Sequence, residues 1–372
     1  MTLAETDQDK LLPLLRQLSE AIEELLLTGL TTASQNTRAK IDVAFREASR
    51  LRLLRLGSTL RVVGEELSRF VRKDESFSRS RFTFFLNRAW LLSRGLARAI
   101  ENKDQQQFLN LLWTPSNEPI ETLKVVTLGV VKRVVPGAFC AFDFRLRTLE
   151  ETSKLPTGTP ASWSCVFPMK PGAVIPPEGF LHLPQKQKFK AAVFLEGREI
   201  LFQKAMLAAS SFATSRVSLL PDSQVAVGDE FSQWSRFATW DMAASLERLR
   251  AYQPSPLDLE VDLQEEIVLD DWQLETAEPE EREHQLIYEV NYGGLAIDLV
   301  VSANDESKPV RDFLKKSAKR KKRPALFGLM HYSMCRPVME PLTALEEAGP
   351  KHLHISNEKI DQKALLQAIQ FT

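Results

Sequence analysis

Seven of the nine positions from 315 to 323 carry lysine or arginine. A cluster of this kind binds polyanions by displacing their counterions, without reading a base sequence. The same composition is typical of a solvated connection between a helix and a strand. Both interpretations stay open for the candidate residues Lys315, Lys316, Lys319, Arg320, Lys321, Lys322 and Arg323.

A second group of cations lies in the middle of the chain. Lys186, Lys188 and Lys190 alternate along a predicted strand, so they would form one row on the outer face of a sheet. OB-type barrels use such rows, together with aromatic side chains, to follow the backbone of a single-stranded nucleic acid. These three lysines are therefore further candidates for binding a polyanion.

Positive and negative charge are segregated along the chain. Residues 38–98 hold 15 lysines and arginines against six acidic residues, and 13 of the 15 are arginines. Arginine presents a planar fork that suits phosphate oxygens, which favours a nucleic-acid surface. Residues 241–289 hold 15 acidic residues against three basic ones. This acidic stretch could instead pair with the basic helices, in the same chain or in a partner copy.

Histidine and cysteine near the end of the chain raise the question of a metal. His331, Cys335, His352 and His354 are the candidate ligands, but structural zinc sites favour paired CxxC spacings and this chain has none. Strand alternation also places Leu353 in the core and both nearby histidines on the solvent side. We therefore predict no metal site and no cofactor.

No catalytic residues are predicted either. The chain lacks the GxxxxGK[ST] phosphate loop, the GxGxxG fingerprint and the GxSxG nucleophile elbow. No carboxylate pair or Cys–His pair has a recognisable third group to orient it.

The predicted secondary structure changes type twice along the chain. Apolar residues recur every three or four positions up to residue 113, which predicts a helical bundle over residues 1–114. Period-two strands and turns then predict a small antiparallel β-barrel or sandwich, OB-like in one interpretation, over residues 115–237. Residues 238–372 read as an α+β domain with acidic strands, a basic loop and a C-terminal helix. The fold class is therefore α+β and multidomain.

Composition sets the expected environment. The formal net charge is −1, and the three cysteines are too few and too scattered for a disulfide framework. Acidic residues stand near the N-terminus where a signal peptide needs positive charge, and no run approaches 18 apolar residues. We expect a cytoplasmic protein that makes no membrane contact.

Three stretches give the chain a family resemblance. They are the leucine- and arginine-rich helical opening, the segment RFATWDMAASLERLRAY, and the segment PALFGLMHYSMCRPVMEPLTAL. They resemble uncharacterised bacterial cytosolic proteins encoded beside SWIM zinc-finger proteins and MoxR-type ATPases. The resemblance implies an accessory component of a multi-protein system and assigns no ligand or active residue.

These observations rank three functions. The first is a non-catalytic interaction or scaffold protein of a bacterial cytoplasmic multi-protein system, acting with protein partners. The alternative is a nucleic-acid-binding module that uses the OB-like barrel and the basic surfaces. The third is an enzyme of unknown class. Oligomeric state is not predicted.

Overall fold

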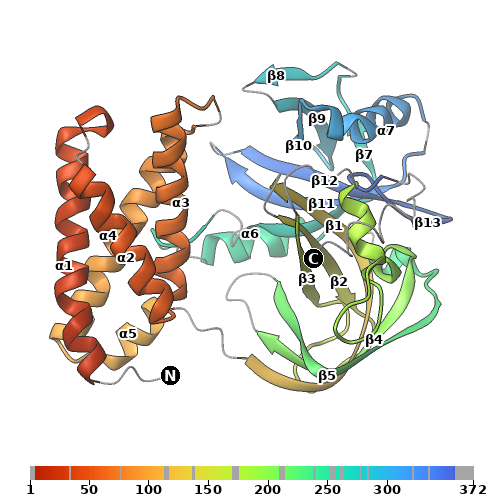
Figure 1. The fold of residues 1–372 in the computed structure, drawn as a ribbon. Coiled ribbons are helices and arrows are strands. Elements are labelled where there is room, and N and C mark those ends of the chain that lie inside the picture. Colours follow the sequence, from red (N-terminus) through yellow and green to blue (C-terminus); the bar gives the residue numbers. More distant parts are fainter. Residues whose placement is uncertain are drawn as a thin grey trace. The chain divides into compact units, whose positions relative to one another are not determined.

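In the computed structural model, the chain forms two compact units. One consists of Met1–Pro115 with Pro254–Asp258, and the other of Ser116–Gln253 with Leu259–Thr372. We call them the helical unit and the β unit (Figure 1). The described residues are 5–32, 35–75, 77–112, 117–135, 139–169, 176–208, 214–237, 240–251, 256–259, 264–276, 278–282, 285–320, 322–333 and 336–356.

The helical unit confirms the predicted helical opening. α1 and α3 each contact both α2 and α4, so four helices form a ring whose leucines and alanines fill the centre. Gly29 follows α1 with a positive φ of 80°, the conformation that glycine adopts most easily at a helix end. The helices are α1 (Glu5–Thr28), α2 (Gln35–Arg50), α3 (Leu54–Arg72), α4 (Arg79–Glu101) and α5 (Gln105–Leu112), with a 3-10 turn at Leu30–Thr32.

The β unit begins with a closed five-stranded barrel, as predicted. Its strands are β1 (Asn117–Val135), β2 (Phe139–Thr148), β3 (Pro160–Pro168), β4 (Arg198–Ala208) and β5 (Ser215–Glu230). They follow the order β1-β2-β3-β5-β4, and β3 with β5 is the parallel pair. This is the strand order of an OB-type Greek-key barrel. Alternation along β2 predicts that Cys140, Phe142, Phe144 and Leu146 face the core, and all four are fully buried in the barrel.

The sequence KFKAAVFLEGREILFQ predicts a hairpin that turns at Glu196-Gly197, and this prediction is wrong. Residues 191–195 form a 3-10 helix, so β4 has no strand partner directly before it. A second 3-10 helix spans Pro177–His182, and both pack with the barrel core between β3 and β4. The chain turns between Pro184 and Lys190, which form an isolated bridge.

A second sheet follows the barrel. Its main strands run in the order β6-β11-β12-β10-β9-β7, with β13 paired to β12 and β8 to β9. The neighbours β10 and β12 are parallel, and α7 lies between β10 and β11 in the chain. The bounds are β6 (Glu265–Leu269), β7 (Trp272–Leu274), β8 (Glu280–Arg282), β9 (Gln285–Tyr292), β10 (Leu295–Ser302), β11 (Ala325–Ser333), β12 (Arg336–Glu346) and β13 (Gly349–His352).

Helices accompany this sheet. The sequence of residues 239–252 predicts one helix, and α6 (Met242–Ala251) lies within that segment. α7 (Lys308–Ala318) precedes the basic cluster. Short 3-10 turns occur at Trp234–Phe237 and Asp305–Ser307. The helix predicted from Asp361 to Phe371 falls outside the described residues. None of the helices in the described ranges is long and apolar enough to span a membrane.

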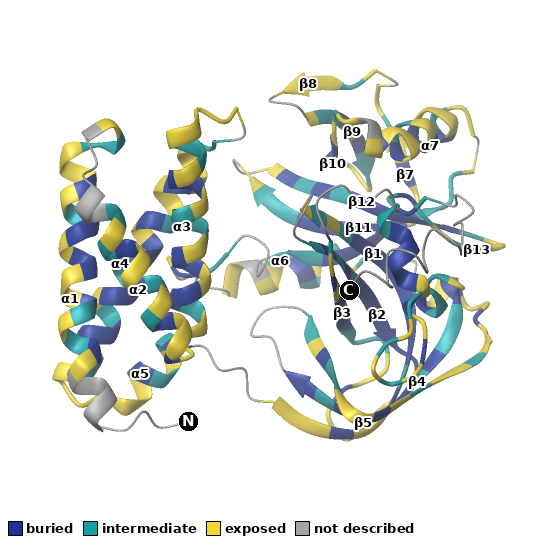
Figure 2. Cartoon of the chain, viewed as in Figure 1, coloured by how far each residue is buried: buried dark blue, intermediate teal, exposed yellow. Residues whose placement is uncertain are grey.

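Both faces of the second sheet are covered. α7 packs Val310, Phe313 and Leu314 on one face. The other face meets the outer side of the barrel, where Val126 and Leu128 of β1 join Phe327 and Leu342 in one buried cluster. Figure 2 shows the resulting run of buried residues along β1, β2 and β12. We call this contact between barrel and sheet the seam.

At the seam, the backbone of β1 lies close to the side chains of the second sheet. A Cβ atom on Gly129 of β1 would lie 2.3 Å from Cε1 of Phe327, nearer than real side chains come. A glycine at this position therefore lets β1 approach the second sheet. The α+β multidomain class is confirmed, while the further domain boundary expected at residue 237 stays a prediction.

Candidate functional site

A buried ion-pair network crosses the seam. Arg147 of β2 donates from Nη1 to Oε2 of Glu266 in β6, and Arg145 Nη1 lies 3.6 Å from Glu266 Oε1. Thr214 Oγ1 donates to Glu266 Oε1 at 3.1 Å, and Arg145 also pairs with Asp143 at 2.7 Å. The Glu266 side chain is only 1% exposed. Because a buried charge needs a partner, this network requires the barrel and the sheet to stay together.

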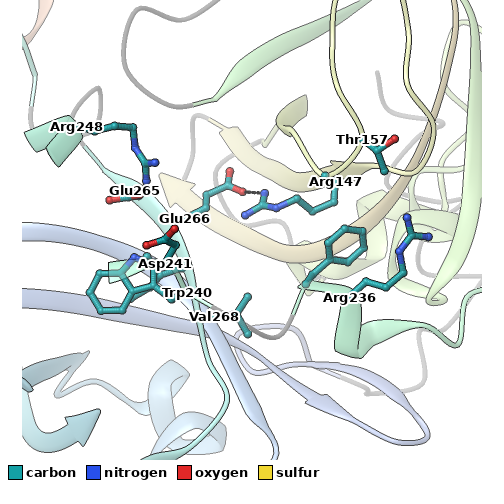
Figure 3. A pocket seen from close by; sticks show the side chains of 12 residues that line it. Arg147, Thr157, Arg236, Trp240, Asp241, Arg248, Glu265, Glu266 and Val268 are labelled. Carbon is teal, nitrogen blue, oxygen red and sulfur yellow. Dashed lines mark hydrogen bonds and ion pairs between the residues drawn. The ribbon is translucent and has the colours of Figure 1, made fainter. Parts of the chain in front are cut away.

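A pocket of about 350 Å³ lies beside the network (Figure 3). Arg248 pairs with Glu265, and Ser245 donates to the same carboxylate. Arg236 donates to Gln233 Oε1 at 3.1 Å and lies 5.8 Å from the centre of the Phe237 ring. The lining residues are Arg147, Thr157, Gly158, Arg236, Phe237, Trp240, Asp241, Arg248, Glu265, Glu266, Ile267 and Val268.

The charges of this pocket balance. Its three arginines face three carboxylates, and two of the arginines are bound to glutamates within the wall. A pocket of this composition offers no excess positive charge for a phosphate chain. Sequence inspection did not connect Arg145 and Arg147 with Glu266, because nothing in the sequence of β2 shows that another sheet covers its outer face.

The row Lys186, Lys188 and Lys190 is not on a strand. All three side chains are exposed, as expected of a polyanion site, but they lie in the turn between Pro184 and Lys190. Lys188 has a φ of +63°, and Gln187 Nε2 donates to the carbonyl of Leu220 at 2.9 Å. The prediction of a row on one strand face is therefore wrong, and the structure places a basic turn there instead.

The cluster from Lys315 to Arg323 is divided between solvent and internal partners. Lys315 and Lys316 stand in the last turn of α7, where positive charge is favourable, and Lys319 follows them at the surface. Arg320 lies 3.4 Å from Glu346, and the exposed Lys322 lies 3.9 Å from Glu347.

Arg323 has a structural role. It donates from Nε to the carbonyl of Ser317 at 3.1 Å, and its guanidinium lies 5.6 Å from the centre of the Trp272 ring. Lys321 lies outside the described residues. Of the seven candidates, Lys315, Lys316 and Lys319 therefore keep the character expected of a polyanion site.

The arginines of the helices are spread over the helical unit. Glu66, whose side chain is fully buried, forms ion pairs with Arg69 at 2.5 Å and with Arg81 at 3.6 Å. Arg50 forms an ion pair with Glu47. A groove of about 450 Å³ between α2 and α3 mixes arginines with carboxylates, so it too carries balanced charge. Its lining is Asp42, Phe45, Leu60, Arg61, Gly64, Glu65, Ser68, Arg69, Arg72 and Asp74.

Part of the acidic stretch meets these helices. The carbonyl oxygen of Leu257 accepts hydrogen bonds from Arg88 Nε at 2.8 Å and from Arg55 Nη2 at 3.3 Å. Asp258 lies 3.8 Å from Arg55. One acidic residue of the stretch, Asp258, therefore pairs with an arginine of the helical unit. We call Pro256–Asp258 the strap.

The candidate metal ligands do not come together. His352 Nδ1 lies 3.0 Å from Thr343 Oγ1, and His354 Nε2 lies 2.8 Å from the carbonyl of Pro341. His331 is on β11, and Cys335 lies outside the described residues. Leu353 is buried as predicted, but His352 and His354 are half-buried and not solvent-facing. Within the described part of the chain, no three potential ligands are placed to hold a metal ion.

The two cysteines of the barrel, Cys140 and Cys165, are buried. Burial raises the pKa of Cys140 to about 11 and that of Cys165 to about 12. A thiol must lose its proton to act as a nucleophile, so both are unreactive at neutral pH.

Comparisons with known proteins do not identify the chain. No family model matches it, and no curated protein matches it. A solved structure described as "Structural mimicry for functional antagonism" has 8% sequence identity, covers 61% of this chain and 92% of its own, and has a TM-score of 0.29. Similarity at this level shows neither a family nor a function. The resemblance to proteins encoded beside SWIM zinc-finger proteins stays a prediction.

The seam network predicts a large effect of a conservative change. Glu266→Gln keeps the shape of the side chain but leaves Arg145 and Arg147 without the buried carboxylate, which should lower the free energy of unfolding by about 3–5 kcal/mol. Urea unfolding measures this directly. The exposed pair of Glu280 and Arg282 supplies the matched control, because Glu280→Gln should leave the midpoint unchanged. Equal shifts for the two variants would contradict the structural role of the network.

His352 predicts a pH dependence of stability. Burial lowers its pKa from 6.5 to about 4. The unfolded chain therefore takes up a proton between pH 6.5 and 4 that the folded ring does not, and stability should fall as pH falls through this window, by about 3 kcal/mol in total. His352→Asn should remove this component from unfolding curves recorded across the window. His182→Asn, at an exposed histidine, should keep the wild-type profile. Identical pH profiles for wild type and His352→Asn would contradict the assignment.

Proposed function

We propose that this protein is a non-catalytic interaction protein that works with protein partners in a bacterial cytoplasmic multi-protein system. One observation carries the proposal. OB-type barrels bind oligonucleotides on the face of strands 2 and 3 and at the adjoining loops. In this barrel the second sheet of the same unit covers β1 and the part of β2 that carries Arg145 and Arg147, which closes one side of that face. A barrel closed in this way serves as a framework for other surfaces.

Charge supports the same conclusion. The pocket at the seam and the groove between α2 and α3 both carry arginine and carboxylate in balance. Phosphate backbones select surfaces with an excess of positive charge, whereas protein interfaces accept both signs at their rims.

Size-exclusion chromatography of a native extract tests the proposal. The protein has a mass of 42.2 kDa and should elute as part of a larger assembly. Nuclease treatment should leave that elution unchanged, because protein contacts hold the assembly. Elution at the mass of a free monomer, or loss of the assembly on nuclease treatment, would contradict the proposal.

Nucleic-acid binding is the second candidate, and the exposed lysines favour it. Lys186, Lys188 and Lys190 occupy one turn, and Lys315, Lys316 and Lys319 lie at the end of α7. A third candidate, an enzyme of unknown class, has no group of residues in the described structure that argues for it.

A binding assay separates the two leading candidates. Under the proposed function, fluorescence anisotropy of labelled 20-nucleotide single- and double-stranded DNA and RNA should show no saturation below about 10 μM protein at 50 mM salt. Submicromolar binding that weakens by about a hundredfold or more at 200 mM salt would favour nucleic acid instead. Two triple Lys→Gln variants, at 186/188/190 and at 315/316/319, would then locate the contact.

A further inference from the structure

The strap completes the helical unit from far along the sequence. Leu257 is 9% exposed and joins the leucine core of the bundle. Its carbonyl oxygen accepts the hydrogen bonds of Arg88 and Arg55, which are 169 and 202 residues away in the chain. Pro256 is exposed, and Asp258 and Leu259 are half-buried. One apolar side chain is therefore inserted, and its neighbours stay near the surface.

The residues that contact the strap are also bonded to one another. Arg88 is 4% exposed, and its Nη1 donates to Thr59 Oγ1 at 3.2 Å. Thr59 Oγ1 in turn donates to the carbonyl of Arg55 at 2.7 Å. These bonds anchor the Arg88 guanidinium to the backbone of α3 through Thr59, and the Arg55 guanidinium reaches the same acceptor from α3. We call Arg55, Thr59 and Arg88 the strap site.

The strap site recognises three features of a peptide. It takes a leucine side chain, the main-chain carbonyl of that leucine, and a carboxylate on the next residue, which meets Arg55. Hydrogen bonds from arginine to a main-chain oxygen do not depend on the rest of the sequence. Any extended peptide with leucine followed by an acidic residue offers the same groups.

We infer that the strap site is a docking site for such Leu-Asp or Leu-Glu peptides of a partner protein, and that the strap is its occupant within the chain. The inference rests on the proposed function, because it states which peptide of a partner protein one surface of this chain binds. A covalently attached occupant is present at an effective concentration in the millimolar range. A partner therefore displaces it only by adding contacts beyond the leucine and the carboxylate.

The test uses the full chain and a labelled peptide of residues 254–260, PSPLDLE. The strap variant carries Leu257→Ser and Asp258→Ser, which removes both recognised side chains from the competing segment. Fluorescence anisotropy should show that this variant binds the peptide at least tenfold more tightly than wild type does. Arg55→Gln in the same background should weaken binding at least fivefold. A peptide with serine in place of the leucine and the aspartate should not bind.

Three results would overturn the inference. The first is no binding by a strap variant whose circular dichroism matches the wild type. The second is equal binding of the two peptides. The third is a dimer of the wild-type chain, found by light scattering and lost in the strap variant, because a second copy would then be the occupant. In each case a nuclease-resistant assembly in extract would leave the proposed function standing.

Hydrogen–deuterium exchange covers the case in which the strap variant does not fold. In wild type, the amides of residues 257–259 should exchange at least a hundredfold faster than those in the middle of α3 and α4, and excess peptide should speed their exchange further. Strap amides as slow as those helices would make the strap a fixed part of the core and would overturn the inference.

Discussion

The buried contact of Arg145 and Arg147 with Glu266 is the constraint on which the β unit depends. It joins β2 of the barrel to β6 of the second sheet through side chains that are largely buried, so neither side can be exposed without leaving charge uncompensated. The apolar cluster around Phe327, and the glycine at position 129 that admits it, bring the same two layers into contact. Barrel and sheet therefore behave as one framework, and the covered face of the barrel is unavailable to a ligand.

The same use of charge recurs across the molecule. Glu66 holds Arg69 and Arg81 in the helical unit, and the strap occupies Arg55 and Arg88. Near α7, Arg323 packs on Trp272. Many arginines that look like a nucleic-acid surface in the sequence thus have partners within the chain, while lysines on the basic turn and at the end of α7 stay exposed. This division favours a protein whose interactions combine both signs of charge.

Local patterns in the sequence predicted the elements well and the site poorly. A 3.6-residue period located the helices, and strict alternation identified the interior of β2 at Cys140, Phe142 and Phe144. Lys186–Lys190 was misassigned because alternating lysines in a turn look the same as a strand face. Glu266 and Leu257 escaped notice because their partners lie 119 and 169 residues away in the chain. No local periodicity reports which outer faces become covered.

Thiol labelling tests the covered barrel face most directly, in a Cys335→Ser background where the native Cys140 and Cys165 stay protonated and buried. Val126→Cys lies in the seam, and Val166→Cys lies on β3, where the valine is 62% exposed. A maleimide should label Val166→Cys as fast as a free surface thiol and Val126→Cys about a hundredfold more slowly, because only local opening exposes the seam. Similar rates at the two positions would contradict the account, since the barrel face would then be open to ligands.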